Sequence, residues 1–348
     1  MTEIFVLQTE TYQDQQRRDV HVMVLSNRET GELAEVLLNT PGGQNRSTGA
    51  GAVNGLLLMD PRTNELREVL PYRRGFAGGV MAPFANRIRE GSYTFSGIRH
   101  QLACNWDEIG TRMTRDGRHA IHGLLPKELE LTSQETSETH ASMMLTAKFD
   151  GTDEGYPFHV QVDLTYRLDA DGLSIAVTAT NVSTQGRPAP FMIGWHPYIQ
   201  LQGSVDRAVV EFDSRSDFVM SEPMGPGPEG QDRDTHPTGR FVPCADFSHG
   251  RPLGDQYWDD GFKALASVHS VPRLETRIFD DVKGGAAIVL WQGPQCRFIQ
   301  VYTGMRDLGV VAVEPMSGQT DCFNNGDGLV VLQAGETWET AFGVRFDL

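Results

Sequence analysis

The chain of 348 residues has few of the features that identify several common protein classes. It holds four cysteines and no C-x-x-C pair, so we predict neither a zinc-ligand spacing nor a disulfide framework. No apolar run approaches the roughly 20 residues of a membrane-spanning helix. The N-terminal segment Met1–Gln8 is too short and too acidic for a signal peptide. We therefore expect a cytoplasmic protein with reduced cysteines and no contact with membranes.

Positive charge is also scarce. Lys and Arg number 30 against 46 Asp and Glu, which gives a net charge of −16. Nucleic acids and anionic membrane surfaces require a basic face, so we expect neither as a partner. A neutral or cationic ligand fits this balance. A phosphorylated ligand stays compatible, because a local arginine cluster can hold a phosphate in an acidic protein.

Helical periodicity is almost absent, and period-two alternation takes its place. Apolar residues recur at every second position from Phe158 to Leu168 and again from Leu173 to Ala179. The turn Asp169–Gly172 separates the two runs, so we predict an antiparallel hairpin. The continuous apolar run Ala286–Trp291 predicts a strand buried on both faces. The one helical candidate is a short turn over Thr63–Leu70.

The organisation of the chain follows from these strands. Pro41–Gly55 and Ser221–Gly239 are rich in Gly, Pro and polar residues and are predicted to be long loops. Strand patterns continue on both sides of each, so neither is interpreted as a domain linker. We predict a single domain over residues 1–348 that is all-β and antiparallel, a large sandwich or a barrel.

Two residues at strand ends combine an acid with a base. An apolar strand ends at His196, and Pro197 then forces the chain out of the ladder, so this imidazole can point into a cleft. Glu314 ends the apolar run Gly309–Val313 and precedes Pro315. Partial burial there raises a carboxyl pKa and makes a better base near neutrality. The alternatives are a hydrogen-bonded histidine at a sheet edge and a solvated strand-end glutamate.

His122 and Arg87 also lie among small or rigid residues. Gly123 follows His122 and allows a bend or a close ligand approach. The spacing of His119 and His122 suits a metal on a helix, but no helix is predicted there and no nearby ligand completes a set, so we predict no metal. Arg87 offers a planar set of donors for hydroxyls or carboxylates. An inert loop histidine and a surface ion pair with Glu90 are the alternatives.

Asp259 and Asp260 stand beside aromatic residues in the segment Tyr257–Phe262. Sugar sites use both residue types, since carboxylates accept from hydroxyls and rings stack on apolar C–H faces. A plain acidic turn is the alternative. Two carboxylates also suit a glycosidase pair, but that interpretation leaves both histidines without a role.

Taken in order, these clusters resemble the aldose 1-epimerase (mutarotase) family from about Pro83 to the C-terminus, and more weakly before it. Each motif is weak alone, and the motifs together, in this order, are specific. One departure is Ile199-Gln200-Leu201 after Tyr198, where the family often has Asn. The matching segments are Asn86–Phe95 with Leu102, Asn105 and His122-Gly123, then Trp195–Tyr198, Val313–Met316, Asp321–Asn324 and Leu332–Glu336.

The resemblance implies a large antiparallel β-sandwich of the galactose mutarotase-like kind, without a cofactor. It implies interconversion of the α and β anomers of a free aldohexose, with Glu314 as general base and His196 as general acid. Near neutral pH the glutamate is then expected to be ionised and the histidine protonated. The implied substrate-binding residues are Asn86, Arg87, His122, Asp259 and Gln292. Asp259 is preferred to Asp260 because the family's aspartate usually lies three residues before a Phe, here Phe262.

Several alternatives stay open at the level of the sequence. A mutarotase for a phosphorylated or unusual sugar would need extra cations such as Arg73, Arg74 or Arg112. A carbohydrate-binding protein without catalysis would not require an acid and a base. A polysaccharide lyase is a further and weaker alternative. In each case the expected partner is a sugar, and the chain is expected to be a monomer or a homodimer.

Overall fold

The structure, a computed structural model, describes residues 3–13, 17–39, 49–71, 76–105, 119–123, 125–126, 128–223, 237–244, 246–265, 272–280 and 286–347. Within these ranges antiparallel strands dominate, and the only α-helix, α1 (Cys322–Asn325), has four residues. The prediction of an all-β, antiparallel fold is therefore confirmed. None of the helices in the described ranges is long and apolar enough to span a membrane.

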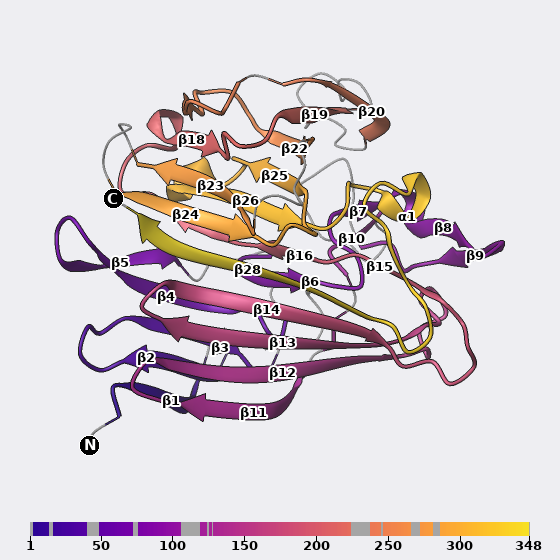
Figure 1. The fold of residues 1–348 in the computed structure, drawn as a ribbon, viewed down its shortest axis with the longest axis horizontal. Coiled ribbons are helices and arrows are strands. Elements are labelled where there is room, and N and C mark those ends of the chain that lie inside the picture. The colour runs from indigo at the N-terminus through magenta and orange to yellow at the C-terminus, as the bar shows by residue number, and fades with distance from the viewer. Residues whose placement is uncertain are drawn as a thin grey trace.

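One layer of the molecule is a nine-stranded antiparallel sheet, which faces the viewer in Figure 1. Its strands are, in spatial order, β11 (Glu130–Thr136), β12 (His140–Asp150), β13 (His159–Asp169), β14 (Gly172–Asn181), β28 (Thr337–Asp347), β24 (Ala287–Gln292), β23 (Leu274–Phe279), β18 (Val209–Phe212) and β21 (Arg251–Pro252).

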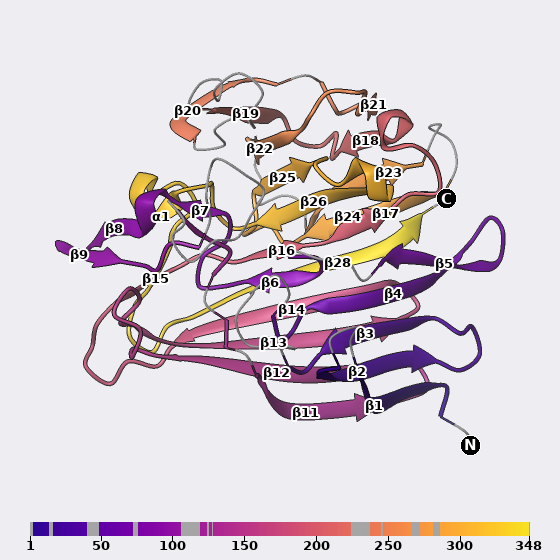
Figure 2. The same ribbon diagram turned by 180° about the vertical axis from the view of Figure 1, so that it is seen from behind.

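Two further sheets form the opposite layer, which is nearer the viewer in Figure 2. The five-stranded sheet contains β1 (Phe5–Gln13), β2 (Asp19–Asn27), β3 (Leu33–Leu37), β4 (Val53–Asp60) and β5 (Glu65–Leu70). The eight-stranded sheet runs in the order β20 (Pro237–Pro243), β19 (Phe218–Pro223), β22 (Asp259–Ala264), β25 (Phe298–Tyr302), β26 (Val310–Met316), β16 (Gly194–His196) and β6 (Gly79–Met81), with β17 (Tyr198–Gln200) also paired to β26.

The layers pack as a sandwich around one large apolar cluster. β1 and β2 contact β12, while β26 of the eight-stranded sheet contacts β24. The cluster takes buried side chains from all three sheets, for example Leu25, Leu164 and Val313. Burial of this apolar area supplies most of the driving force for folding.

The β13–β14 hairpin is the most regular part of the structure. Inward and outward positions alternate along the whole of β13, and the five apolar residues from Val160 to Leu168 are fully buried. Asp169 pairs with Gly172 across the two-residue connection. β24 lies between β23 and β28, and most of its residues are buried. Both strand predictions are confirmed.

Three local predictions need correction. The turn of helix expected over Thr63–Leu70 is wrong, because Glu65–Leu70 forms β5 against β4. The predicted loop Pro41–Gly55 ends in a strand, since β4 begins at Val53. The predicted loop Ser221–Gly239 overlaps the ends of β19 and β20, which pair with each other. The intervening parts, 41–48 and 224–236, lie outside the described residues.

Short elements next to the eight-stranded sheet complete the surroundings of the site. The hairpin β8–β9 extends from the body of the molecule in Figure 1. The short pairs are β7 (Arg87–Ile88) with β10 (Ala120–Ile121), β8 (Ser92–Phe95) with β9 (Ile98–Gln101), and β15 (Ala189–Phe191) with β27 (Val330–Leu332).

Candidate active site

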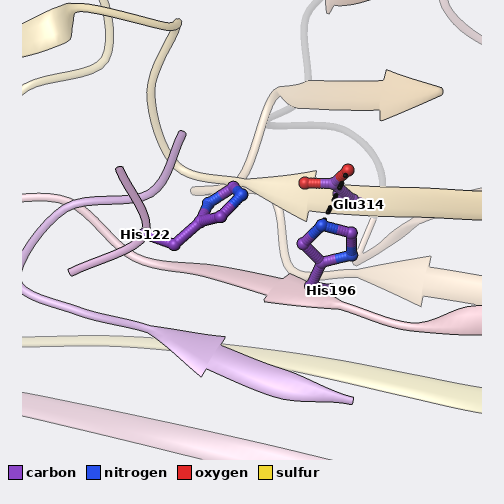
Figure 3. Close-up of side chains that lie close together, drawn as sticks. All are labelled: His122, His196 and Glu314. Atoms are coloured by element: carbon purple, nitrogen blue, oxygen red, sulfur yellow. Dashed lines mark ion pairs between the residues drawn. The ribbon is translucent and has the colours of Figure 1, made fainter. Parts of the chain in front are cut away.

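Three ionisable side chains from distant parts of the sequence meet on the eight-stranded sheet. His196 comes from β16, Glu314 from β26 and His122 from the turn that follows β10 (Figure 3). One nitrogen or oxygen of each lies within 4.8 Å of those of the other two. The fold thus brings an acid, a base and a further hydrogen-bonding group to one place.

The contact between His196 and Glu314 joins neighbouring strands. His196 Nε2 lies 3.4 Å from Glu314 Oε1, and the two side chains are only 5 % and 3 % exposed. His196 Nδ1 and Glu314 Oε2 are buried and have no hydrogen-bond partner. Such orphaned polar atoms are uncommon in native interiors and mark a site where a ligand can supply the missing bonds.

His122 is oriented by a reciprocal pair of bonds with Asn86. The amide of Asn86 donates to His122 Nδ1 at 3.2 Å, and the amide of His122 donates to the Asn86 carbonyl at 3.0 Å. Both residues have positive φ, 54° and 61°, a conformation that favours glycine and is often found at functional sites. At Gly123 a Cβ would lie 2.3 Å from the carbonyl oxygen of Ala82, so only glycine fits this turn.

The imidazole of His196 lies between two aromatic rings. Tyr198 stacks on one side with a centroid distance of 4.9 Å, and Phe76 stacks at 5.9 Å. Phe76 also meets His122 edge-on at 4.2 Å. The two stacked rings therefore help to hold the orientation of this imidazole.

Arg87 and Asp259 form the second half of the site. Arg87 Nη2 lies 3.4 Å from Asp259 Oδ2, so the arginine pairs with this aspartate rather than with Glu90. Asn86 Oδ1 accepts from Arg87 Nη1 at 3.1 Å. Gln300 donates to Asp259 Oδ1 at 2.7 Å and accepts from Asn86 Nδ2 at 3.3 Å. This chain of bonds fixes donors and acceptors before any ligand arrives.

Burial decides the charges of the free site. It lowers the pKa of His196 from its usual 6.5 to about 3, and Arg87 adds to the lowering. Burial and the Asp259 carboxylate raise the pKa of Glu314 well above its usual 4.5. Burial, His196 and Arg87 lower the pKa of His122. Burial therefore favours the neutral forms of both groups in the free site, whereas the expectation from the sequence is an ionised Glu314 beside a protonated His196.

The same three side chains contain the donor types of a metal site, two imidazoles and a carboxylate. The hydrogen bond at His122 argues against that role. Its Nδ1 accepts from a backbone amide, so the neutral ring carries its proton on Nε2, and neither nitrogen has a lone pair to offer an ion. His119 Nδ1 likewise accepts from the amide of Glu90. The tautomer instead makes His122 Nε2 a hydrogen-bond donor.

Two glutamines lie differently from the prediction, which places Gln292 and not Gln300 in the site. Gln292 is buried on β24, and its amide donates to the carbonyls of Cys296 and Phe298, so both amide protons serve the backbone. Gln300, which the sequence analysis did not select, pairs across the sheet with Glu314 and bonds to Asp259. The sequence does contain a signal for Gln300, because it is the polar residue in the alternating run Phe298–Tyr302. Asp260 points to the other face of β22 from Asp259.

Comparison with known proteins adds an independent line of evidence. A family model for aldose 1-epimerase matches residues 60–345. The uncharacterized protein YihR of Escherichia coli K12 is 26% identical over 273 residues, which cover 77% of this chain and 78% of that protein. The uncharacterized protein YphB of the same organism is 25% identical over 281 residues, covering 77% and 82%.

Solved structures show the same architecture. A galactose mutarotase-like protein from Clostridium acetobutylicum superposes with a TM-score of 0.72 at 15% identity, over 98% of each chain. The galactose 1-epimerase from Lactobacillus acidophilus NCFM gives a TM-score of 0.69 at 16% identity, over 99% of each chain. At these identities the likeness establishes the fold, a galactose mutarotase-like sandwich. The family model covers most of the chain, and the protein belongs to the aldose 1-epimerase family.

Proposed function

We propose that the protein is a mutarotase that interconverts the α and β anomers of a free aldohexose. The observation that carries the proposal is the 3.4 Å separation of His196 Nε2 and Glu314 Oε1. Mutarotation requires an acid and a base to act on two oxygens bonded to the same carbon, the anomeric hydroxyl and the ring oxygen. Two groups this close suit that task, whereas glycosidase carboxyls flank a bond from roughly 5 Å or more apart.

In the proposed reaction Glu314 takes the proton from the anomeric hydroxyl while His196 protonates the ring oxygen. The C1–O5 bond breaks and leaves an open-chain aldehyde. Rotation about C1–C2 presents the other face of the carbonyl, and the ring closes with the two residues returning their protons. No redox change occurs and no co-reactant is consumed, so general acid–base catalysis suffices.

The remaining polar groups would hold the sugar during this opening and closing. Arg87 and the Nε2–H of His122 donate to substrate oxygens, while Asp259 accepts from hydroxyls. Gln300 takes the supporting role first given to Gln292. Arg87 and Asp259 balance each other's charge, so the site as a whole suits a neutral substrate.

The charges required by the mechanism differ from those of the free site by the position of one proton. A neutral Glu314 with a neutral His196 and an ionised Glu314 with a protonated His196 contain the same number of protons. Transfer across their contact therefore changes no net charge, and its extent does not vary with pH. Activity should fall when the pair gains a second proton in acid and when it loses its proton in base. We expect a bell-shaped pH–rate profile whose two limbs belong to the pair.

Polarimetry of freshly dissolved α-D-galactose and α-D-glucose tests the proposal. Catalytic amounts of protein should speed the decay to the equilibrium rotation, and the two rates rank the sugars. If neither sugar is accelerated, a mutarotase for galactose or glucose is ruled out. A mutarotase for a phosphorylated sugar would then become the favoured alternative. The arginines named for that alternative, Arg73, Arg74 and Arg112, lie outside the described residues.

A further inference from the structure

The chain that follows Glu314 forms a buried polar segment to which the proposed reaction gives no role. Four of its polar residues are at most 6 % exposed, namely Ser317, Gln319, Thr320 and Asp321. Ser317 exchanges two bonds with Ile193, whose amide donates to Ser317 Oγ at 3.0 Å and whose carbonyl accepts from the Ser317 amide at 2.8 Å. Ile193 directly precedes β16, the strand of His196. The segment therefore begins at the strands of the proposed acid and base.

The segment ends at Asp321, which bonds to β7, the strand that begins with Arg87. The amide of Asp321 donates to the Arg87 carbonyl at 2.8 Å, and Asp321 Oδ1 accepts from the Arg89 amide at 2.9 Å. Within the described residues β7 pairs with one other strand, β10. Asp321 therefore acts as a second neighbouring strand, with its carboxylate in the place of a backbone carbonyl. Both views show α1, which follows Asp321, beside β7 (Figure 1, Figure 2).

The carboxylate of Asp321 is itself held in place. Asn324 Nδ2 donates to Asp321 Oδ1 at 2.7 Å and to the carbonyl of Ser92 at 2.9 Å. The guanidinium of Arg89 lies near the other oxygen, with Nε 3.8 Å from Asp321 Oδ2. Asp321 has a φ of 63°, a conformation that aspartate and asparagine tolerate better than most residues with a side chain. The acceptor that bonds to the Arg89 amide is thus fixed from several sides.

Arg87 is the site residue whose backbone this contact fixes. Its guanidinium lies 3.4 Å from Asp259 Oδ2 and 3.1 Å from Asn86 Oδ1. Hydrogen bonds weaken steeply as their distance and angle change, so a long side chain keeps both contacts only while its Cα stays in place. A shift of β7 would therefore misdirect the donors of Arg87 without removing any of them.

We propose that Asp321 is a positioning residue of the sugar site, which sets the direction of the Arg87 guanidinium by fixing the backbone of β7. This inference rests on the proposed mutarotase function, in which Arg87 donates to substrate oxygens. Asp321 acts through Arg87 and not through the sugar. The buried segment from Ser317 to Asp321 then links the strand of the proposed base to the strand of the arginine.

Replacing the Asp321 side chain in two ways tests the proposal in the full-length protein. Asp321→Gly removes the carboxylate and keeps the left-handed backbone without strain. It should lower kcat/KM for α-D-galactose in polarimetry by about 3- to 10-fold, the effect of one hydrogen bond, mainly through KM. Asp321→Asn keeps an acceptor for the Arg89 amide and should stay within about twofold of the wild type. Asn64→Gly, at an exposed left-handed position between β4 and β5, is the control and should change neither constant.

A second pair of proteins shows whether the effect passes through Arg87. In the Arg87→Ala background, Asp321→Gly should change kcat/KM by less than about twofold, because no guanidinium is left to displace. Its effect on thermal stability should be the same in both backgrounds, since the lost bond to the Arg89 amide is the same. Thermal unfolding of each variant also gives the folded fraction to which the rates refer.

The outcomes separate this inference from the function on which it rests. An equal loss of kcat/KM in both backgrounds would overturn the positioning role, since Asp321 would then act on the fold as a whole. A loss in Asp321→Asn as large as in Asp321→Gly would overturn it too, because the acceptor is still present. An unchanged kcat/KM in Asp321→Gly would leave the mutarotase standing without the positioning role. If the wild-type protein accelerates neither α-D-galactose nor α-D-glucose, the mutarotase for these sugars fails, and the role given to Asp321 fails with it.

Discussion

The β13–β14 hairpin and the centre of the eight-stranded sheet are both interior antiparallel strands, yet they bury different chemistry. The inward positions of β13 hold only apolar residues and Tyr166, such as Val162 and Leu164. The matching positions of β16, β26 and β25 hold His196, Glu314 and Gln300, each almost fully buried. The same strand geometry thus buries apolar side chains in one region and ionisable or hydrogen-bonding groups in the other.

This difference indicates a division of energetic roles. Apolar burial in the nine-stranded sheet stabilises the fold at about 25 cal/mol per Å², whereas buried ionisable groups oppose folding unless they are paired or neutral. His196 Nδ1 and Glu314 Oε2 remain without partners. We infer that the regular sheet compensates for a site that is destabilising until a ligand fills it.

The largest expected effect comes from replacing Glu314, the proposed base in the eight-stranded sheet. Glu314→Gln keeps the shape of the side chain but cannot accept the anomeric proton, so kcat should fall by about 10²- to 10⁴-fold. Polarimetry gives the rate, and calorimetric titration with galactose should show binding retained within a few-fold. The exposed Glu339→Gln on β28 is the control. A loss of less than tenfold would remove Glu314 from the chemistry.

The hairpin should respond in the opposite way. Leu164→Ala removes a fully buried side chain and should lower the free energy of unfolding by about 2–5 kcal/mol. The turnover of the folded fraction should stay the same, because β13 contributes no group to the site. Chemical denaturation measures the stability and polarimetry the turnover.

The neighbouring Thr165→Ala is the matched control for the hairpin. Thr165 faces outward on the same strand, so this change should alter stability by roughly 0.5 kcal/mol or less. A loss of turnover in folded Leu164→Ala would mean that the two regions are coupled, and the division of roles would then need revision.

The two regions also differ in how far the sequence predicts them. Alternation over Phe158–Ala179 predicts the hairpin because each residue's environment repeats at period two. The segment Thr63–Leu70 is wrongly predicted to be a turn of helix, since its apolar residues also match a helical spacing. In β5 the alternating position 67 holds a buried arginine, whose guanidinium contacts Asp280 at 2.5 Å. A partner so distant in sequence cannot be seen from the local pattern.

The site shows the same limit. The motifs in the sequence predict five site residues that the structure brings together, namely Glu314, His196, His122, Arg87 and Asp259. Gln292 and Gln300 both lie in strands, and only the cross-strand register distinguishes the one opposite Glu314 from the one that bonds to backbone carbonyls. The charge of the His196–Glu314 pair depends on burial, which the sequence does not specify.

A smaller effect should follow from replacing Tyr198, whose ring stacks on His196, the proposed acid. Tyr198→Leu removes the stack on His196 and should lower kcat by about 2- to 12-fold, the equivalent of one aromatic pair, with little change in KM. Tyr198→Phe keeps the ring and should stay within about twofold of the wild type, since stacking depends on the ring. The acid limb of the pH–rate profile should move in the Leu variant only, because stacking favours the protonated imidazole. Equal losses in both variants would assign the effect to the hydroxyl instead.

The smallest expected effect is a pH-dependent change in stability that shows the energetic cost of the site directly. Burial raises the pKa of Glu314 above its unfolded value near 4.5, so the native state binds this proton more tightly than the unfolded state. Its contribution to stability is complete below pH 4.5 and is lost as the pH rises through the native pKa.

Glu314→Gln cannot titrate and should therefore gain thermal stability relative to the wild type between pH 5 and pH 8, on the order of a few °C in Tm. The lowered pKa of His196 destabilises both proteins in acid and largely cancels in the difference. A Tm difference that stays constant or shrinks over this range would show that Glu314 is ionised at little cost in the native protein, and the contrast between the two sheets would lose its energetic basis.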